Sequence, residues 1–135
     1  MSASSARAPA DLMGFQYVVL RCVPRADREE FLNVGVVLFC QQADFLVARC
    51  HVDPGRLAAL AADTDVQAVC LALEAVQAVC RGDESAGAAG RGPLGTRFGF
   101  VRAPRSTVVQ PGPVHGGRTL DPDSDLDHLV QRLVR

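Results

Sequence analysis

The chain has 135 residues, of which 48% are apolar and 21% are charged, proportions typical of a folded protein that buries one core. Its 14 cationic residues are all arginines and nearly balance 15 acidic residues, which leaves a net charge of −1. The lack of lysine excludes a Schiff-base enzyme, a lysine general base and a Walker-type phosphate loop. The charge balance argues against a nucleic-acid binder that relies on a broad cationic face.

The first residues contain none of the apolar runs that mark export or membrane anchoring. Residues 1–14 are rich in Ser, Ala and Pro, and we predict a flexible tail there, followed by a single domain over residues 15–135. No segment approaches the roughly 18 to 20 apolar residues that a membrane span needs. We therefore expect a cytoplasmic protein that does not act at a membrane.

The cysteine pattern predicts reduced thiols and no metal site. An odd number of cysteines without a Cys-x-x-Cys pair fits neither a disulfide framework nor zinc spacing. We expect no cofactor. The five are Cys22, Cys40, Cys50, Cys70 and Cys80.

Three apolar segments in the first part of the chain predict an antiparallel three-stranded meander. Residues 15–23 (FQYVVLRCV), 31–40 (FLNVGVVLFC) and 45–52 (FLVARCHV) are rich in β-branched and aromatic residues and are joined by short polar connections. The middle segment is almost continuously apolar, which favours a central strand covered on both faces.

The apolar period then changes to that of helices. Asp53 and Pro54 predict an N-cap and first residue of a short helix that ends near residue 62. Thr64-x-x-Gln67 matches a capping box, and apolar residues at 66, 69, 70, 73, 76 and 80 predict a long helix. Leu71 widens this stripe, so we expect more than half of the helix circumference to be buried.

The C-terminal half is less regular until its last segment. Residues 81–92 predict a flexible loop, and residues 93–102 fit a helix slightly better than a strand. Residues 103–120 hold a short β-prone core at 107–109 within a long irregular segment, a type that is often functional. Asp121, Pro122 and an apolar stripe over 126–134 predict an amphipathic helix that docks on the sheet or on a partner. The whole pattern predicts an α+β fold, with an antiparallel sheet packed by the long helix and the C-terminal helix.

Polar residues inside two predicted strands are candidate site residues. Asn33 and Gly35 interrupt the second strand, on the face that we assign to Phe31, Val37 and Phe39. They form a ligand-facing notch, or Asn33 braces the neighbouring turn. Arg21 lies inside the first strand and needs a partner, which is either Glu29 or Glu30 across the hairpin or a bound anion.

A third group of polar side chains lies in the irregular segment. Arg105, Ser106, Thr107, Gln110 and His115 together have the chemistry to bind a phosphate or carboxylate, or they pin the loop through their own hydrogen bonds. Ser106 and His115 suggest a nucleophile and a base, but no Gly-x-Ser-x-Gly elbow accompanies them.

Three stretches resemble the bacterial domain of unknown function 3037 family. They are the aromatic-led strand at 15–23 with Pro24, followed by REEFLNVGVVL at 28–38; APRSTVVQPGPVH at 103–115; and the closing Asp-rich helix. Gly112 departs from the small polar residue expected there. The resemblance covers residues 15–134 and implies no established activity and no catalytic residues. It does imply a HipA-like kinase as a partner, since family members are often encoded beside such kinases.

These observations predict a non-enzymatic accessory or regulatory protein-binding subunit, with a HipA-like kinase as the partner that the resemblance implies. The alternative is an enzyme or small-anion-binding protein with a pocket around Arg21, Asn33, Arg105 and His115. The ligand and the oligomeric state stay open. The candidate ligand or partner site comprises Arg21, Glu30, Asn33, Gly35, Arg105, Ser106, Gln110 and His115.

Overall fold

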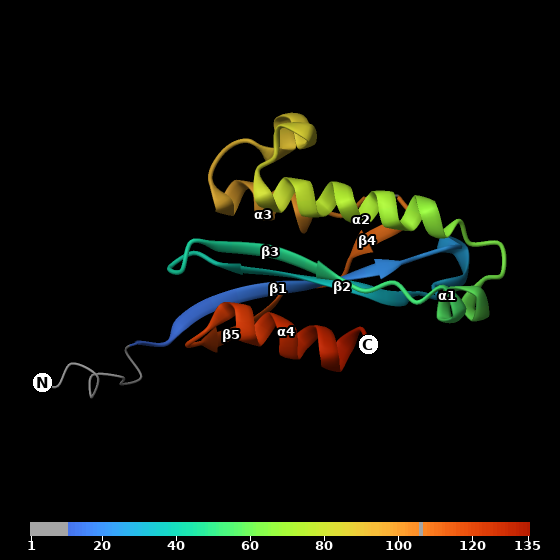
Figure 1. Ribbon diagram of the computed structural model, residues 1–135, viewed down its shortest axis with the longest axis horizontal. Coiled ribbons are helices and arrows are strands. Elements are labelled where there is room, and N and C mark those ends of the chain that lie inside the picture. The colour runs from blue at the N-terminus through green and yellow to red at the C-terminus, as the bar shows by residue number, and fades with distance from the viewer. Residues whose placement is uncertain (1–10, 106) are drawn as a thin grey trace, which may run out of the picture.

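The structure is a computed structural model that describes residues 11–105 and 107–135. Figure 1 shows helices on both sides of one sheet. The predicted tail lies outside the described residues over 1–10, and the first strand begins at Met13, before the predicted end of that tail. In chain order the elements are β1 (Met13–Cys22), η3 (Ala26–Arg28), β2 (Leu32–Cys40), β3 (Phe45–Cys50), α1 (Pro54–Leu60), α2 (Val66–Arg81), η4 (Glu84–Gly90), α3 (Leu94–Val101), β4 (Val109–Pro111), β5 (His115–Thr119) and α4 (Pro122–Leu133).

The predicted α+β class is confirmed. The described residues form a five-stranded antiparallel sheet in the order β3-β2-β1-β4, and β5 pairs with the same edge of β1 as β4 does. The meander β1–β2–β3 has the predicted order, and β2 lies inside the sheet. β4 and β5 together form one interrupted edge strand, because the pairing with β1 shifts by one residue between Pro111 and His115.

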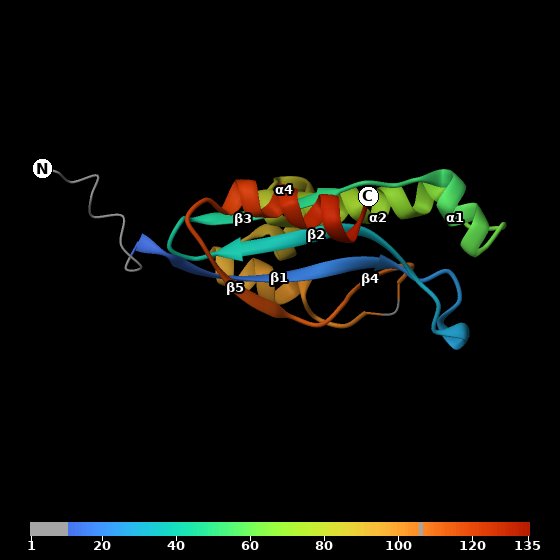
Figure 2. The same cartoon turned by 90° about the horizontal axis from the view of Figure 1, so that it is seen from below.

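The sheet separates two apolar clusters. Val18, Leu20 and Val37 face α2 and α3, whereas Val36 and Leu38 face α4. Adjacent strand residues point to opposite faces, and so the mostly apolar β2 contributes to both clusters. Helix α4 packs on β2 and β3, in front of which it lies in Figure 2, and Figure 1 shows it on the side of the sheet opposite α2.

A bulge in β2 changes the predicted facing of its polar residues. Leu20 pairs with Gly35 but Arg21 pairs with Asn33, so Val34 is an extra residue in the ladder. Val34 therefore joins the cluster under α2, and Asn33 turns toward α4. The prediction that Asn33 shares a face with Val37 is wrong, because strict alternation does not hold across a bulge.

Two helix caps are confirmed and one is displaced. Asp53 accepts hydrogen bonds from the N–H groups of Gly55 and Arg56, and Asp121 accepts one from Ser124. The predicted capping box at Thr64 is wrong: Asp65 caps α2, and the Thr64 hydroxyl instead donates to the Ala61 carbonyl. A carboxylate one residue later competes successfully for the free N–H groups of the first turn.

The predictions for residues 81–120 are confirmed in one segment and incomplete in the other two. Helix α3 confirms the favoured helical interpretation of residues 93–102. The predicted flexible loop at 81–92 includes the 3-10 segment η4, which packs against α2. The irregular segment 103–120 contains β4, which begins at the last residue of the predicted β-prone core, and β5, which the sequence did not reveal because this glycine-rich strand lacks a β-branched pattern.

Candidate functional site

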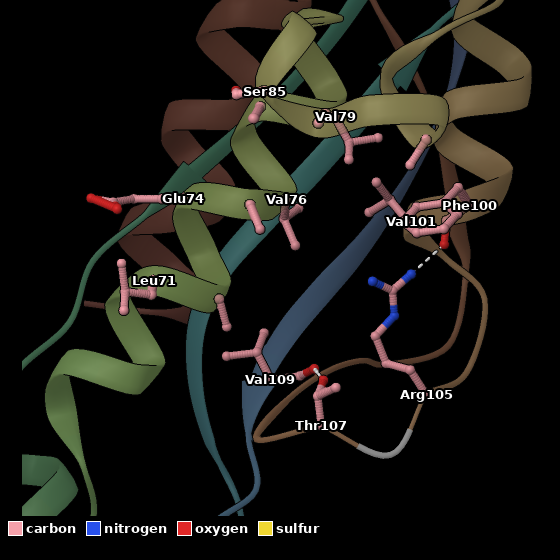
Figure 3. Close-up of a pocket in the computed structure, with 15 residues that line it drawn as sticks. Leu71, Glu74, Val76, Val79, Ser85, Phe100, Val101, Arg105, Thr107 and Val109 are labelled. Atoms are coloured by element: carbon pink, nitrogen blue, oxygen red, sulfur yellow. Dashed lines mark hydrogen bonds between the residues drawn. The ribbon is translucent and has the colours of Figure 1, made fainter.

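An apolar cavity of about 550 Å³ lies between α2, η4, α3 and the segment that leads into β4. Val76 and Val79 from α2 form one wall, and Val101 and Val109 contribute to the opposite side. Figure 3 shows these side chains directed into a shared space. A volume of this size falls in the range of ligand-binding cavities, and its lining is mostly aliphatic.

Two large apolar side chains border the cavity without being covered. Leu71 is 57% exposed and Phe100 is 46% exposed. The prediction that Leu71 belongs to the buried stripe of α2 is wrong. Helix α2 packs on the sheet through Val69 and Leu73, and no other described element covers the side on which Leu71 lies.

Sequence reasoning missed Phe100 as a site residue, although a signal was present. Phe98 and Phe100 are two positions apart on a helix and therefore point in nearly opposite directions. Phe98 is buried against Phe39, with ring centroids 5.1 Å apart. A second large apolar side chain on the other face of so short a helix has no core to enter.

Arg105 supplies the cation of the cavity. Its Nη2 donates a short hydrogen bond to the Phe100 carbonyl, and its guanidinium carbon lies 4.8 Å from the centre of the Phe100 ring. Nε donates a long bond of 3.4 Å to the Ala103 carbonyl. These contacts fix the direction of the side chain along the edge of the cavity, as Figure 3 shows.

Arg21 lies on the face of the sheet opposite the cavity. It is stacked between Phe31 and Gly112, which belong to two of the stretches that resemble the family. Its guanidinium carbon is 4.1 Å from the centre of the Phe31 ring. A Cβ placed on Gly112 would lie 3.1 Å from the same carbon, so this glycine permits the close stacking. The buried Nε of Arg21 has no hydrogen-bond partner within the part of the chain that the structure describes.

The predicted ion pair between Arg21 and Glu29 or Glu30 is not among the ion pairs of residues 11–105 and 107–135. Glu30 instead pairs with Arg28 at 2.6 Å on the exposed turn, and the hydrogen bond from Arg28 holds the pKa of Glu30 below its usual value. Arg28 is only two residues from Glu30 in the chain, so this ion pair is local to the turn and does not cross the hairpin.

The two candidate residues in β2, Asn33 and Gly35, make contacts within the fold. The Asn33 amide donates to the Leu133 carbonyl at 3.0 Å, so it caps the end of α4 rather than the neighbouring turn. Gly35 is buried, and a Cβ there would lie 2.9 Å from the Cys50 Sγ atom. This glycine therefore permits the close approach of β2 and β3.

The remaining candidates are spread along the β4–β5 edge. Gln110 pairs with Arg21 across the ladder, and its amide donates to the Thr107 carbonyl at 3.0 Å. The exposed ring of His115 lies 5.1 Å from the ring of Tyr17. Ser106 lies outside the described residues, so the proposed Ser106–His115 pair has no described geometry.

The structure does not bring the predicted residues around one pocket. Asn33 contacts α4 on one face of the sheet, whereas Arg105 lines the cavity beside α2 on the other face. The two sequence signatures do meet, but they meet at β1, where Arg21 has Asn33 on one side and Gln110 on the other. The pocket predicted around Arg21, Asn33, Arg105 and His115 is therefore divided by the sheet.

The buried thiols are poor nucleophiles. Burial raises the pKa of Cys50 to about 11 and that of Cys80 to about 12, and it also raises the pKa of Cys22. Each group thus stays a neutral thiol near pH 7. Among residues 11–105 and 107–135, no cluster of His, Cys, Asp or Glu is suited to hold a metal ion.

The fold and this site define an α+β protein that carries an apolar cavity between its helices and the edge of its sheet. The chain belongs to the family described as protein of unknown function (DUF3037), whose model matches residues 17–134. This confirms the predicted family. No curated protein and no solved structure matches the chain. No described helix is long and apolar enough to cross a membrane.

Proposed function

We propose that this protein is a non-enzymatic accessory subunit that binds another protein through the cavity between α2, η4, α3 and β4. The observation that carries the proposal is the uncovered apolar surface formed by Leu71, Phe100 and the cavity between them. Surfaces of this kind, where large apolar side chains surround a hollow, favour protein docking.

The apolar pattern of α2 supports the same proposal. Val69 and Leu73 bury one side of the helix against the sheet, while Leu71 extends the apolar surface beyond what this chain covers. A partner that inserts apolar side chains between Leu71 and Phe100 removes this surface from water, a gain of roughly 25 cal/mol per Å².

The test is complex formation with a HipA-like kinase, the partner that the family resemblance implies. Leu71→Glu and Phe100→Glu place charges at the cavity edge, so each is expected to weaken the complex at least tenfold in calorimetric titration. Both side chains are about half exposed, so the variants are expected to unfold at nearly the wild-type urea concentration.

Leu120→Glu is the matched control, because Leu120 is 51% exposed and does not line the cavity. It should leave kinase binding unchanged. A complex that survives both cavity substitutions would show that the docking surface lies elsewhere. No association of the wild-type protein at micromolar concentration would contradict the kinase as partner.

A further inference from the structure

We propose that the polypeptide segment that enters this cavity carries a carboxylate beside its apolar side chains, and that Arg105 binds this carboxylate. The inference rests on the proposed function, since it specifies the chemistry of the partner at the same cavity. It adds a polar recognition element to a surface otherwise defined by aliphatic and aromatic contacts.

The first observation is that Arg105 has no acidic partner among the described residues. None of the ion pairs found in residues 11–105 and 107–135 includes it, although its side chain is half-buried. Glu74 is the acidic residue that lines the cavity, and Figure 3 shows its carboxylate directed away from Arg105. A cation beside apolar walls is incompletely solvated, and so it gains more from an added anion than a fully exposed cation does.

The second observation concerns which nitrogens of Arg105 are available. Nη2 and Nε donate to the carbonyls of Phe100 and Ala103, whereas Nη1 has no hydrogen-bond partner in the described chain. The buried unsatisfied atoms of that part of the chain do not include Nη1, so it lies at an accessible surface. Figure 3 shows this end of the guanidinium group facing the space between α2 and β4.

The third observation is that the cation is already oriented. The carbonyl contacts and the Phe100 ring, 4.8 Å from the guanidinium carbon, hold the group in one direction before a ligand arrives. A fixed donor loses little conformational freedom on binding, and arginine recognises carboxylates well. A ligand whose carboxylate accepts from Nη1 and whose apolar part packs against Val76 and Val79 would contact both the cation and the aliphatic wall of the cavity.

The test compares decanoate with decanol, two probes that share an alkyl chain and differ in the anionic group. We expect wild-type protein to bind decanoate about tenfold more tightly than decanol at pH 7, measured by calorimetry below the concentrations at which the probes aggregate. Arg105→Gln should abolish this preference and leave decanol binding unchanged, which also shows that the cavity is intact.

Arg102→Gln is the matched control. It removes the same charge from the same segment, but Arg102 is exposed and does not line the cavity. It should preserve the preference for decanoate. If Arg102→Gln and Arg105→Gln reduce the preference equally, general charge accounts for it and the inference is overturned.

The outcomes separate this inference from the function on which it rests. Equal binding of both probes to the wild-type protein overturns the role of Arg105 while the apolar cavity remains a binding site. Absence of binding by either probe overturns this inference, whereas protein docking at Leu71 and Phe100 is decided separately by the kinase titration.

Discussion

Gly35 illustrates how one residue controls the spacing of two strands. A Cβ at this position would lie 2.9 Å from the Cys50 Sγ atom and 3.2 Å from the Arg49 carbonyl oxygen, which belongs to the backbone of β3 and cannot easily move. We expect Gly35→Ala to lower the free energy of unfolding by about 1–3 kcal/mol, measured by urea denaturation, because the extra carbon overpacks this contact.

Gly99→Ala is the matched comparison, since a Cβ there has nothing within 4 Å and the residue lies inside α3. It should raise the free energy of unfolding by about 0.5–1 kcal/mol through the higher helix propensity of alanine. Equal effects of the two substitutions would contradict close packing at Gly35.

Asn33 shows that a polar residue in a strand need not be a binding residue. Its amide satisfies the Leu133 carbonyl at the end of α4, a group that the helix itself leaves without a donor. We expect Asn33→Ala to lower the free energy of unfolding by about 0.5–1.5 kcal/mol. Asn33→Asp should cost more at pH 7, because a carboxylate cannot donate to the carbonyl; unchanged stability in both variants would exclude this cap.

At the scale of an element, α4 depends on its apolar stripe more than on its charges. Leu126 is fully buried against the sheet, whereas the ion pairs of Arg49 with Asp123 and Asp127, at 2.9 and 2.7 Å, are partly exposed. Exposed ion pairs each contribute about 0.2–1 kcal/mol. Burial of Leu126 therefore dominates the docking of this helix.

Leu126→Ala is expected to lower the free energy of unfolding by about 2–5 kcal/mol, because it leaves a cavity between α4 and β2. Leu120→Ala, which removes the same atoms just before the helix at a 51% exposed position, should change it by less than about 0.5 kcal/mol. Thermal unfolding followed by circular dichroism measures both. A small loss in Leu126→Ala would mean that α4 contributes little to the folded state.

At the scale of the whole molecule, the buried thiols couple folding to alkaline pH. The pKa values of Cys50 and Cys80 are about 11 and about 12 in the folded protein, compared with 9.0 for an exposed thiol. Above pH 9 the unfolded chain releases these protons while the folded protein retains them, so the unfolded state is favoured. Stability is thus unaffected by these thiols below pH 9 and falls as the pH rises from 9 toward 11.

We expect urea midpoints to decrease between pH 9 and pH 11 in the wild-type protein. The Cys50→Ala/Cys80→Ala variant, although less stable at pH 7, should show a shallower decrease over the same interval because neither thiol remains to ionise. Identical slopes for the two proteins would contradict burial as the cause of the raised pKa values.

The elements that the sequence predicts well are those with strong local signals. β2 and α4 follow from a nearly continuous apolar run and from a capped amphipathic stripe, and Asp53 and Asp121 mark helix starts within a residue. These features depend on residues that are close together in the chain, and their spacing can be read directly from the sequence. β5 has no such signal, since its structure comes from pairing with β1, which lies far away in the chain.

The candidate site was predicted less well, for the same physical reason. Residue types and segments identified Arg21, Asn33 and Arg105 as unusual, but the bulge at Val34 and the sheet itself determine that Asn33 and Arg105 face opposite sides. The sequence shows that Leu71 is an apolar residue on α2, but it does not show that this side chain is exposed.

The sequence by itself therefore determined the α+β class, the meander and the caps of α1 and α4, because apolar periodicity and capping are local properties, and three stretches of similar sequence determined the family. Only the tertiary structure decided which faces are covered. The cavity at Leu71, Phe100 and Arg105 exists because α2, α3 and β4 meet there without a further layer above them, and such packing depends on long-range contacts that no local pattern encodes.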